Sequence, residues 1–295
     1  MKIGVDGGGT KTECILVDAA GSIVARHTAP GTNPSVVGFE NAGEVFQDAL
    51  HALLAHSTIR NLKSKIGETR LFMAGSQSFW QEQTAGLRDF GAVTVAPDSL
   101  PVLELATDGE PGLVLHAGTG SFVAARSLDG TVRYAGGFGW RLGDPASGYE
   151  IARRAVARAI LELQGWAPPS RLAAVVRDAV QADDAGGVTR FFYEQAEATR
   201  EIASLAPDVL RLAAEDDPAA LEITLDACLP LLDLARQVAQ KLFADIPPDQ
   251  LRAGLTGPIL THPKIAGALM PRVPWKLSVI TAPPIEGVRR LLARG

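Results

Sequence analysis

The chain has 295 residues, of which 46% are hydrophobic and 21% charged, and its formal net charge is −5. These values exclude a disordered chain, leave room for about two domains, and argue against nucleic acid as a partner, because no basic stripe occurs. No apolar run reaches the roughly 18 residues that a membrane span needs, and Met1-Lys2 leads directly into a strand-like run, so we expect a cytoplasmic protein without a membrane partner.

The first apolar run ends in an acid, and a glycine turn follows it. Asp6 ends the run, Gly7-Gly8-Gly9-Thr10-Lys11 forms the turn, and residues 14–17 read as a second strand. Glycines lack the Cβ atoms that keep a ligand away from backbone N–H groups, so these groups can point at one anion. Thr10 adds a hydroxyl donor, and Asp6 offers a carboxylate for hydrated Mg²⁺. The pattern indicates a triphosphate site, although a plain β-hairpin with a Gly-Gly turn fits the same residues.

Strand and helix patterns then alternate up to about residue 108. A third strand is expected over 22–28, an amphipathic helix over 40–56, strands over 70–74 and 92–96, and a helix over 81–90. Asp98 follows the last strand and precedes a helical run over residues 100–106. An Asp at this place is a favoured N-cap, and it is equally well placed to act as a base.

The same layout begins again at Gly112. An apolar run over 113–117 leads into Gly118-Thr119-Gly120-Ser121, and strands follow over 122–128 and 131–135. A repeated α/β unit with a glycine turn after the first strand of each copy is a specific signal. It suggests that two such turns hold one phosphate chain from both sides of a cleft.

A glycine-dense loop over residues 136–144 follows the second set of strands and leads into a helix. Asp144 precedes Pro145 in the pattern of an N-cap, so capping and ligand binding are both open for it. His116 is expected to be a core histidine, and Trp140 and Arg141 either contact a ligand or pack locally. Residues 172–243 read as mostly helical, with breaks near 186–187 and 216–218. Strands over 252–255 and 277–281 and a helix over 285–293 complete the chain.

Taken together, these motifs resemble the actin, sugar kinase and heat-shock ATPase superfamily. Within it the chain is most similar to the BadF/BadG/BcrA/BcrD-type ATPase family, and there to the N-acetylglucosamine kinase branch. The residues that carry the resemblance span nearly the whole chain: 6–12, Thr32-Asn33, Asp98, 118–121, 136–139, 142–144, Gly257-Pro258 and 284–287. The resemblance implies an α/β fold of duplicated ribonuclease-H-like domains with a central cleft. It places the domains at residues 1–108 and 109–282, with a helix over 283–295 packing back on the first.

The resemblance also implies an ATP- and Mg²⁺-dependent carbohydrate kinase. Asp98 would be the general base and a sugar ligand, and Asp6 would hold Mg²⁺ through water. The ATP-binding residues would be Gly8, Gly9, Thr10, Lys11, Gly118, Thr119, Gly120 and Gly257. The other sugar-binding residues would be Asn33, Ser121, Gly137, Phe138, Gly139 and Asp144, although Asn33 before Pro34 also fits a simple turn. The family often forms homodimers through the second domain.

Two departures from the sugar kinase pattern fall near the expected sugar pocket. Pro145 stands where the branch commonly has an acidic residue, and Phe122 stands where it has an asparagine. N-acetylglucosamine or glucosamine is the first expectation for the substrate, and another hexose or a keto-deoxy sugar acid is the alternative.

Other classes of protein fit the sequence less well. The GxxxxGK[ST] pattern of P-loop NTPases is absent, and the first glycines open a strand, not the helix of a Rossmann fold. A redox activator ATPase of the same family would need paired cysteines for an iron–sulfur cluster, but Cys14 and Cys228 are isolated. A non-catalytic sensor of sugar or nucleotide would have no need of a base at Asp98.

Overall fold

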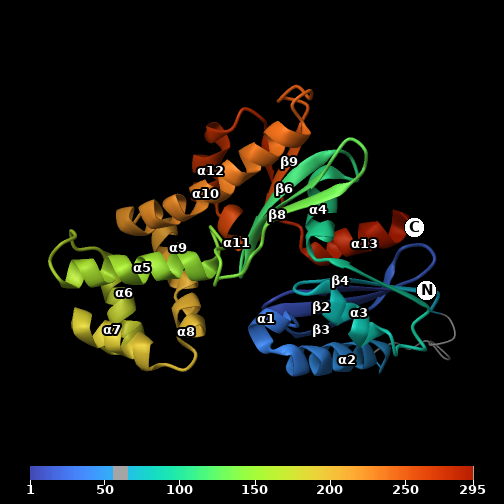
Figure 1. The fold of residues 1–295 in the computed structure, drawn as a ribbon, viewed down its shortest axis with the longest axis horizontal. Coiled ribbons are helices and arrows are strands. Elements are labelled where there is room, and N and C mark those ends of the chain that lie inside the picture. Colours follow the sequence, from blue (N-terminus) through green and yellow to red (C-terminus); the bar gives the residue numbers. More distant parts are fainter. Residues whose placement is uncertain (56–65, 295) are drawn as a thin grey trace. The chain divides into compact units, whose positions relative to one another are not determined.

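The computed structural model describes residues 1–55 and 66–294, and the chain divides into two compact units (Figure 1). Unit 1 consists of Met1–Gly109 together with Ala282–Gly295, and unit 2 consists of Glu110–Thr281. Each unit contains a mixed five-stranded sheet flanked by helices, so the predicted α/β class with a duplicated architecture is confirmed.

The sheet of unit 1 has the order β3-β2-β1-β4-β5. Its strands are β1 (Lys2–Gly7), β2 (Lys11–Val17), β3 (Ile23–Pro30), β4 (Glu68–Met73) and β5 (Ala92–Pro97). The first three strands form an antiparallel meander, and β4 and β5 add to β1 in parallel. Because β1, β4 and β5 are parallel, their carboxyl ends lie at one edge of the sheet.

Within the described part of unit 1, five helices accompany this sheet: α1 (Pro34–Val37), α2 (Phe39–Ala55), α3 (Gln77–Thr84), α4 (Ser99–Thr107) and α13 (Pro284–Arg294). The amphipathic face of α2 buries Phe46 and Leu50 in one core with Trp80 of α3. The helix predicted over 81–90 in fact begins at Gln77, where the Ser76 side chain accepts a hydrogen bond from the Phe79 N–H. Residue 56, the predicted end of α2, lies outside the described residues.

The sheet of unit 2 repeats this topology, with the order β10-β9-β6-β7-β8. Its strands are β6 (Gly112–Ala117), β7 (Ser121–Arg126), β8 (Val132–Gly136), β9 (Arg252–Thr256) and β10 (Leu277–Val279). Here too the first strand is central, with an antiparallel meander on one side and two parallel strands on the other. The last strand is shorter than the predicted 277–281.

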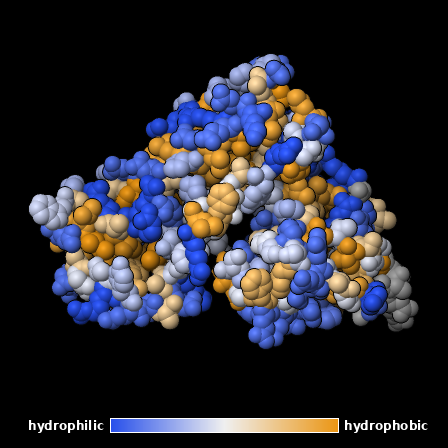
Figure 2. All heavy atoms as spheres, viewed as in Figure 1, coloured by the Kyte–Doolittle hydropathy of each residue, from blue (hydrophilic) through white to orange (hydrophobic). Residues whose placement is uncertain are grey.

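Unit 2 carries most of the helices. They are α5 (Gly148–Leu163), α6 (Arg171–Val180), α7 (Ala185–Glu194), α8 (Ala198–Ser204), α9 (Ala206–Ala214), α10 (Pro218–Leu242), α11 (Gly257–Leu260) and α12 (Pro263–Leu269), followed by the 3₁₀ helix η2 (Met270–Arg272). The helical segment is interrupted between Val180 and Ala185, close to the break predicted near Gly186-Gly187; the two glycines themselves lie in the first turn of α7, which Asp184 caps. Figure 2 shows apolar atoms at the surface over α5 and α6. Among the described helices, none is long and apolar enough to cross a membrane.

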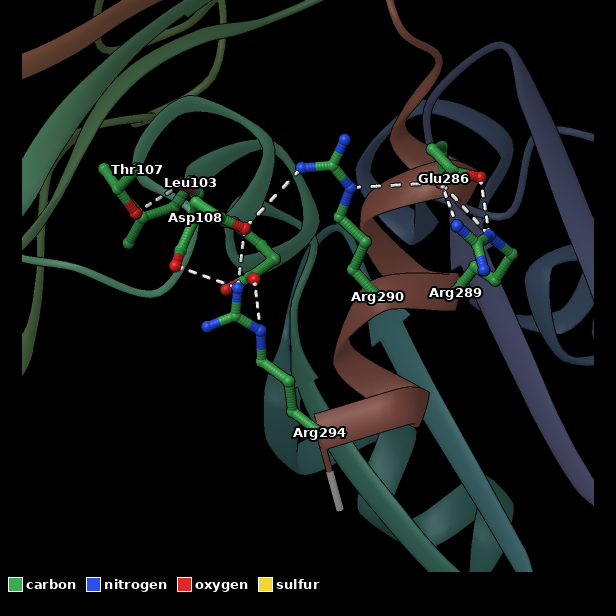
Figure 3. A network of polar contacts seen from close by, with 8 residues as sticks. Leu103, Thr107, Asp108, Glu286, Arg289, Arg290 and Arg294 are labelled. Carbon is green, nitrogen blue, oxygen red and sulfur yellow. Dashed lines mark hydrogen bonds and ion pairs between the residues drawn. The ribbon is translucent and has the colours of Figure 1, made fainter. Parts of the chain in front are cut away.

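Helix α13 comes from the far end of the chain and packs on α4, β1 and β2 of unit 1. The two helices approach so closely that a Cβ on Gly287 would overlap the Pro101 carbonyl oxygen. Figure 3 shows the polar contacts at their ends, where the Arg294 guanidinium donates to the Asp108 carboxylate at 2.6 Å and pairs with buried Glu104 at 2.9 Å. Helix α13 therefore fixes the position of α4, the helix that begins directly after Asp98.

Gly287→Ala is expected to destabilise the protein by about 1–3 kcal/mol, because the new methyl group must push α13 away from the backbone of α4. Urea unfolding followed by circular dichroism measures the change. Gly267→Ala in α12 is the matched control: nothing surrounds that position, and alanine favours a helix, so it should stabilise by up to about 1 kcal/mol. Equal effects of the two substitutions would contradict this account of the α13–α4 contact.

Candidate functional site

The turn between β1 and β2 is held by backbone contacts on both sides. The Gly8 N–H donates to the Lys11 carbonyl at 3.0 Å, and the Gly8 carbonyl accepts from the N–H groups of Thr32 and Asn33 at 3.0 and 3.2 Å. Neither Gly7 nor Gly8 has a positive φ. The simple hairpin alternative, in which glycine only meets a need for positive φ, therefore lacks support at these two positions. Gly7 is instead required by close packing, since a Cβ there would lie 2.5 Å from the Met73 methyl group.

Two carboxyl groups of unit 1 follow strands that end at the same edge of the sheet. Asp6 lies on β1, opposite Phe72 on β4, and Phe72 in turn lies opposite Ala96 on β5, two residues before Asp98. Burial, with smaller contributions from the charges of Asp98 and Glu13 and against that of Lys11, raises the pKa of Asp6 to about 7. Burial also raises the pKa of Asp98 to about 6, although the N–H groups of Asp98 and Ser99 oppose this shift.

The capping alternative for Asp98 is not supported. Asp98 occupies the N-cap position of α4, but its backbone is already helical (φ −61°, ψ −13°) and its side chain makes no capping hydrogen bond. Its carboxylate therefore interacts with the N–H groups of Asp98 and Ser99 without forming a helix cap.

Asn33 does act as a turn residue. Its side-chain oxygen accepts a hydrogen bond from the Ser35 N–H at 3.0 Å and so caps the short helix α1. The neighbouring Thr32 hydroxyl lies 2.9 Å from that of Thr12, within the buried part of the same unit. No local sequence pattern marks this threonine pair or Glu13, whose position opposite Asp6 follows from the hairpin register once the turn is known.

In unit 2, Asp144 ties the second glycine turn to the glycine-dense loop. Its Oδ1 accepts from the Gly139 N–H at 3.1 Å, and a Cβ on Gly120 would lie 3.1 Å from its Oδ2. Burial raises the pKa of this carboxyl, and the N–H groups of Gly139, Ser121 and Phe138 oppose the shift. The capping alternative for Asp144 does not hold, because Ser147 caps α5 by accepting from the Glu150 N–H.

The remaining predicted residues of unit 2 lie in the second glycine turn, in the glycine loop and at the start of α11. The turn closes with a hydrogen bond from the Gly118 N–H to the Gly120 carbonyl at 2.9 Å. Gly136, Gly137 and Gly139 all have a positive φ, between 69° and 78°. Gly257 opens α11 with a φ of 83°, and a Cβ there would overlap the Ala117 carbonyl oxygen. Local backbone packing thus requires Gly257, while its role in binding ATP stays a prediction.

The aromatic and basic residues of the glycine loop pack on one another. The Arg141 guanidinium carbon lies 5.1 Å from the centre of the Trp140 ring, and that ring lies 5.5 Å from the ring of Tyr149. Phe138 is 66% exposed. Of the two alternatives for Trp140 and Arg141, ligand contact and local packing, local packing therefore accounts for both residues.

The structure thus gathers the predicted residues in two groups. Unit 1 holds the first glycine turn with Asp6, Asn33 and Asp98, and unit 2 holds the second turn with the glycine loop, Asp144 and Gly257. No group of three or more His, Cys, Asp or Glu side chains suited to a metal occurs among residues 1–55 and 66–294.

Comparison with known proteins gives a consistent result. The chain is 27% identical to N-acetyl-D-glucosamine kinase of Dictyostelium discoideum over 258 residues, covering 82% of this chain and 80% of that one. It is 23% identical to N-acetylmuramic acid/N-acetylglucosamine kinase of Clostridium acetobutylicum over 206 residues, covering 69% and 67%. A proposed N-acetylglucosamine kinase from Chromobacterium violaceum has a similar structure, with a TM-score of 0.75, 28% identity, and coverage of 99% and 98%.

The family comparison extends over most of the chain. A match to the BadF/BadG/BcrA/BcrD ATPase family covers residues 3–269, which include both glycine turns, Asp98, the glycine loop and Gly257. The chain belongs to the BadF/BadG/BcrA/BcrD ATPase family.

Proposed function

We propose that this protein is an ATP-dependent carbohydrate kinase that transfers the γ-phosphoryl group to a hydroxyl of N-acetylglucosamine or glucosamine. The observation that carries the proposal is the pair of carboxyl groups, Asp6 and Asp98, beside the first glycine turn, both with a pKa raised toward neutrality. The names of the relatives, which are sugar kinases, support the same activity.

Asp98 is the proposed general base. A base works best when its pKa lies just below the working pH, because it is then ionised and still takes a proton readily. With a pKa of about 6, the carboxylate is ionised at neutral pH and can accept the proton of a sugar hydroxyl. Phosphoryl transfer otherwise depends on positioning and on stabilisation of charge, which backbone N–H groups of glycine turns provide.

The residues of unit 1 fit a magnesium ion at Asp6. Burial and two neighbouring carboxylates raise the pKa of Asp6, so a divalent cation there would relieve an unfavourable concentration of negative charge. Mg²⁺ usually binds through one or two carboxylates, several waters and substrate phosphates, so it needs no dense ligand cluster. When bound, the ion would neutralise charge on the transferred phosphoryl group. Asp6 would hold it, through water, beside the turn residues Gly8, Gly9, Thr10 and Lys11.

The proposed acceptor residues are Asn33, Asp98, Ser121, Gly137, Phe138, Gly139 and Asp144. Asp144 already accepts hydrogen bonds from N–H groups of the loop, so we assign it first to holding the loop in shape. Only its remaining acceptor capacity is assigned to the sugar. Nucleotide contacts in unit 2 are proposed for Gly118, Thr119, Gly120 and Gly257.

The redox activator alternative is weaker than the kinase. Cys14 and Cys228 are both buried free thiols, and burial raises the pKa of each to about 12, whereas cluster ligands must be thiolates. A homodimer and a cytoplasmic location, which fits the use of ATP, remain parts of the proposal.

A substrate panel tests the function. ADP release should rise well above the basal rate with N-acetylglucosamine or glucosamine, and less with hexoses, N-acetylmuramic acid or keto-deoxy sugar acids. Phe122 and Pro145 make this panel informative, since both replace polar residues of the kinase pattern. A basal rate that no sugar raises would overturn the kinase assignment.

The rate should depend on pH through Asp98. Its base form is lost as the pH falls below a pKa of about 6, so kcat/KM for the sugar should drop about tenfold per pH unit below pH 6 and level off above it. Initial rates from pH 5 to 8 at saturating ATP give the profile, and circular dichroism over the same range checks that the protein stays folded. A flat profile in folded protein would contradict the assignment of Asp98.

A further inference from the structure

Four side chains form a row across the sheet of unit 2 at the end where its proposed binding loops begin. His116 on β6 lies opposite Thr256 on β9 and opposite Phe122 on β7. Phe122 also lies opposite Gly136 on β8, and Tyr134, two residues before Gly136, points to the same face. We call Thr256, His116, Phe122 and Tyr134 the aromatic row.

The members of the aromatic row contact one another in sequence. The rings of His116 and Phe122 stack with their centres 4.9 Å apart, and those of Phe122 and Tyr134 stack at 5.0 Å. His116 Nδ1 lies 3.0 Å from the Thr256 hydroxyl, which donates to the Leu115 carbonyl at 3.2 Å. The single proton of the Thr256 hydroxyl is thus used in the bond to Leu115. The His116 ring, which burial keeps neutral, therefore donates from Nδ1 to the Thr256 oxygen.

Each member of the row also touches or adjoins one of the three loops. Thr256 directly precedes Gly257. His116 lies beneath the second glycine turn, since a Cβ on Gly118 would stand 3.5 Å from its Nε2. A Cβ on Gly137 would overlap the Tyr134 ring, so the glycine loop rests directly on that ring. Phe122, the central member, immediately follows the turn residue Ser121.

The row lies where the core meets the loops. Thr256 and Phe122 are buried and Tyr134 is 47% exposed, whereas the core beneath this sheet consists of fully buried aliphatic side chains such as Leu113, Leu115 and Val123. Flat rings that lie against glycine backbone restrict the loop, since the loop cannot move toward the sheet without displacing a ring.

We propose that the aromatic row is a positioning device that holds the Gly257 turn, the second glycine turn and the glycine loop at a fixed spacing. This inference rests on the proposed kinase function, in which these loops contact the nucleotide and the sugar. Its members act through the loops and not by touching the substrate. The row would thus keep the nucleotide and acceptor parts of unit 2 aligned for transfer, which matters because small misplacements can cost about 100-fold in rate.

Steady-state kinetics of three variants test the proposal. Tyr134→Ala should raise KM for the sugar about tenfold and leave KM for ATP nearly unchanged, because only the loop on its ring is released. Phe122→Leu, at the centre, should raise both KM values and lower kcat. Tyr134→Phe keeps the ring and should restore the KM for the sugar. Tyr193→Ala, which removes an exposed tyrosine from α7 of the same unit, is the matched control and should have no effect.

Hydrogen exchange gives a readout that does not depend on activity. Backbone amides of residues 137–143 should exchange faster in Tyr134→Ala and Phe122→Leu than in the wild type or Tyr193→Ala, in the absence of any ligand. Wild-type exchange in both row variants would overturn the positioning role. A wild type that phosphorylates no sugar would instead overturn the kinase, and the exchange result would still decide whether the row holds the loop.

Discussion

Replacement of Asp98 by asparagine is expected to lower kcat for phosphoryl transfer by a factor of about 10²–10⁴, the usual contribution of a general base. The amide has nearly the same shape as the carboxyl group but cannot take the proton of the sugar hydroxyl. Since Asp98 makes no capping hydrogen bond, its loss should not disrupt the start of α4. Coupled detection of ADP at saturating sugar measures kcat, and isothermal titration calorimetry measures the affinity for ATP, which should be retained.

Asp48→Asn is the matched control for this experiment. Asp48 is exposed on α2 of the same unit and should tolerate the same change without loss of activity. If Asp98→Asn kept the wild-type kcat, Asp98 would not be the base. A loss of ATP affinity equal to the loss of kcat would show that Asp98 serves nucleotide binding instead.

Asp6→Asn should have the second large effect, a fall in kcat/KM of about 100-fold or more, because the proposed magnesium ion supplies several kcal/mol of charge stabilisation. The same change should stabilise the metal-free protein at pH 8. Burial raises the pKa of Asp6 from 3.8 to about 7, so folding favours the neutral acid, and this stabilisation is lost as the pH rises through 7. The neutral amide removes the cost of holding a buried charge.

Thermal unfolding in EDTA at pH 5 and pH 8 separates the two effects. The Tm of Asp6→Asn should exceed that of the wild type at pH 8, and the difference should shrink at pH 5, where the wild-type carboxyl is protonated. A variant that is inactive and also less stable at pH 8 would mean that Asp6 is structural. A variant with full activity at saturating Mg²⁺ would contradict its role at the metal.

The fold was largely predictable because its signals are local and repeated. Apolar runs that end at glycine turns located the strands, and their repetition after Gly112 predicted two similar sheets, which the common strand order confirms. Helix boundaries were less predictable. Helix α3 is mostly polar, with Gln77, Gln81 and Glu82 among its eight residues, so apolar periodicity could not locate its start, and the Ser76 cap defines it instead.

The site was predictable where it depends on strand ends, and not where it depends on tertiary hydrogen bonds. Asp6 lies near the end of β1 and Asp98 directly follows β5, so the strand patterns located both residues. Asp144 before Pro145 has the local pattern of a helix cap, but Ala146 adopts a positive φ of 68° and delays the helix to Gly148. Its real partner, the Gly139 N–H, is fixed by the path of the loop. No local pattern indicated that partner.

The most direct test of the central claim is ³¹P NMR of a reaction containing the wild-type protein, ATP, Mg²⁺ and N-acetylglucosamine. The account predicts that the γ-phosphate signal of ATP is replaced by a sugar phosphomonoester signal in equal amount with ADP, and that Asp98→Asn forms this product at least about 100-fold more slowly. Inorganic phosphate as the only new signal, with N-acetylglucosamine and with every other sugar of the panel, would contradict it.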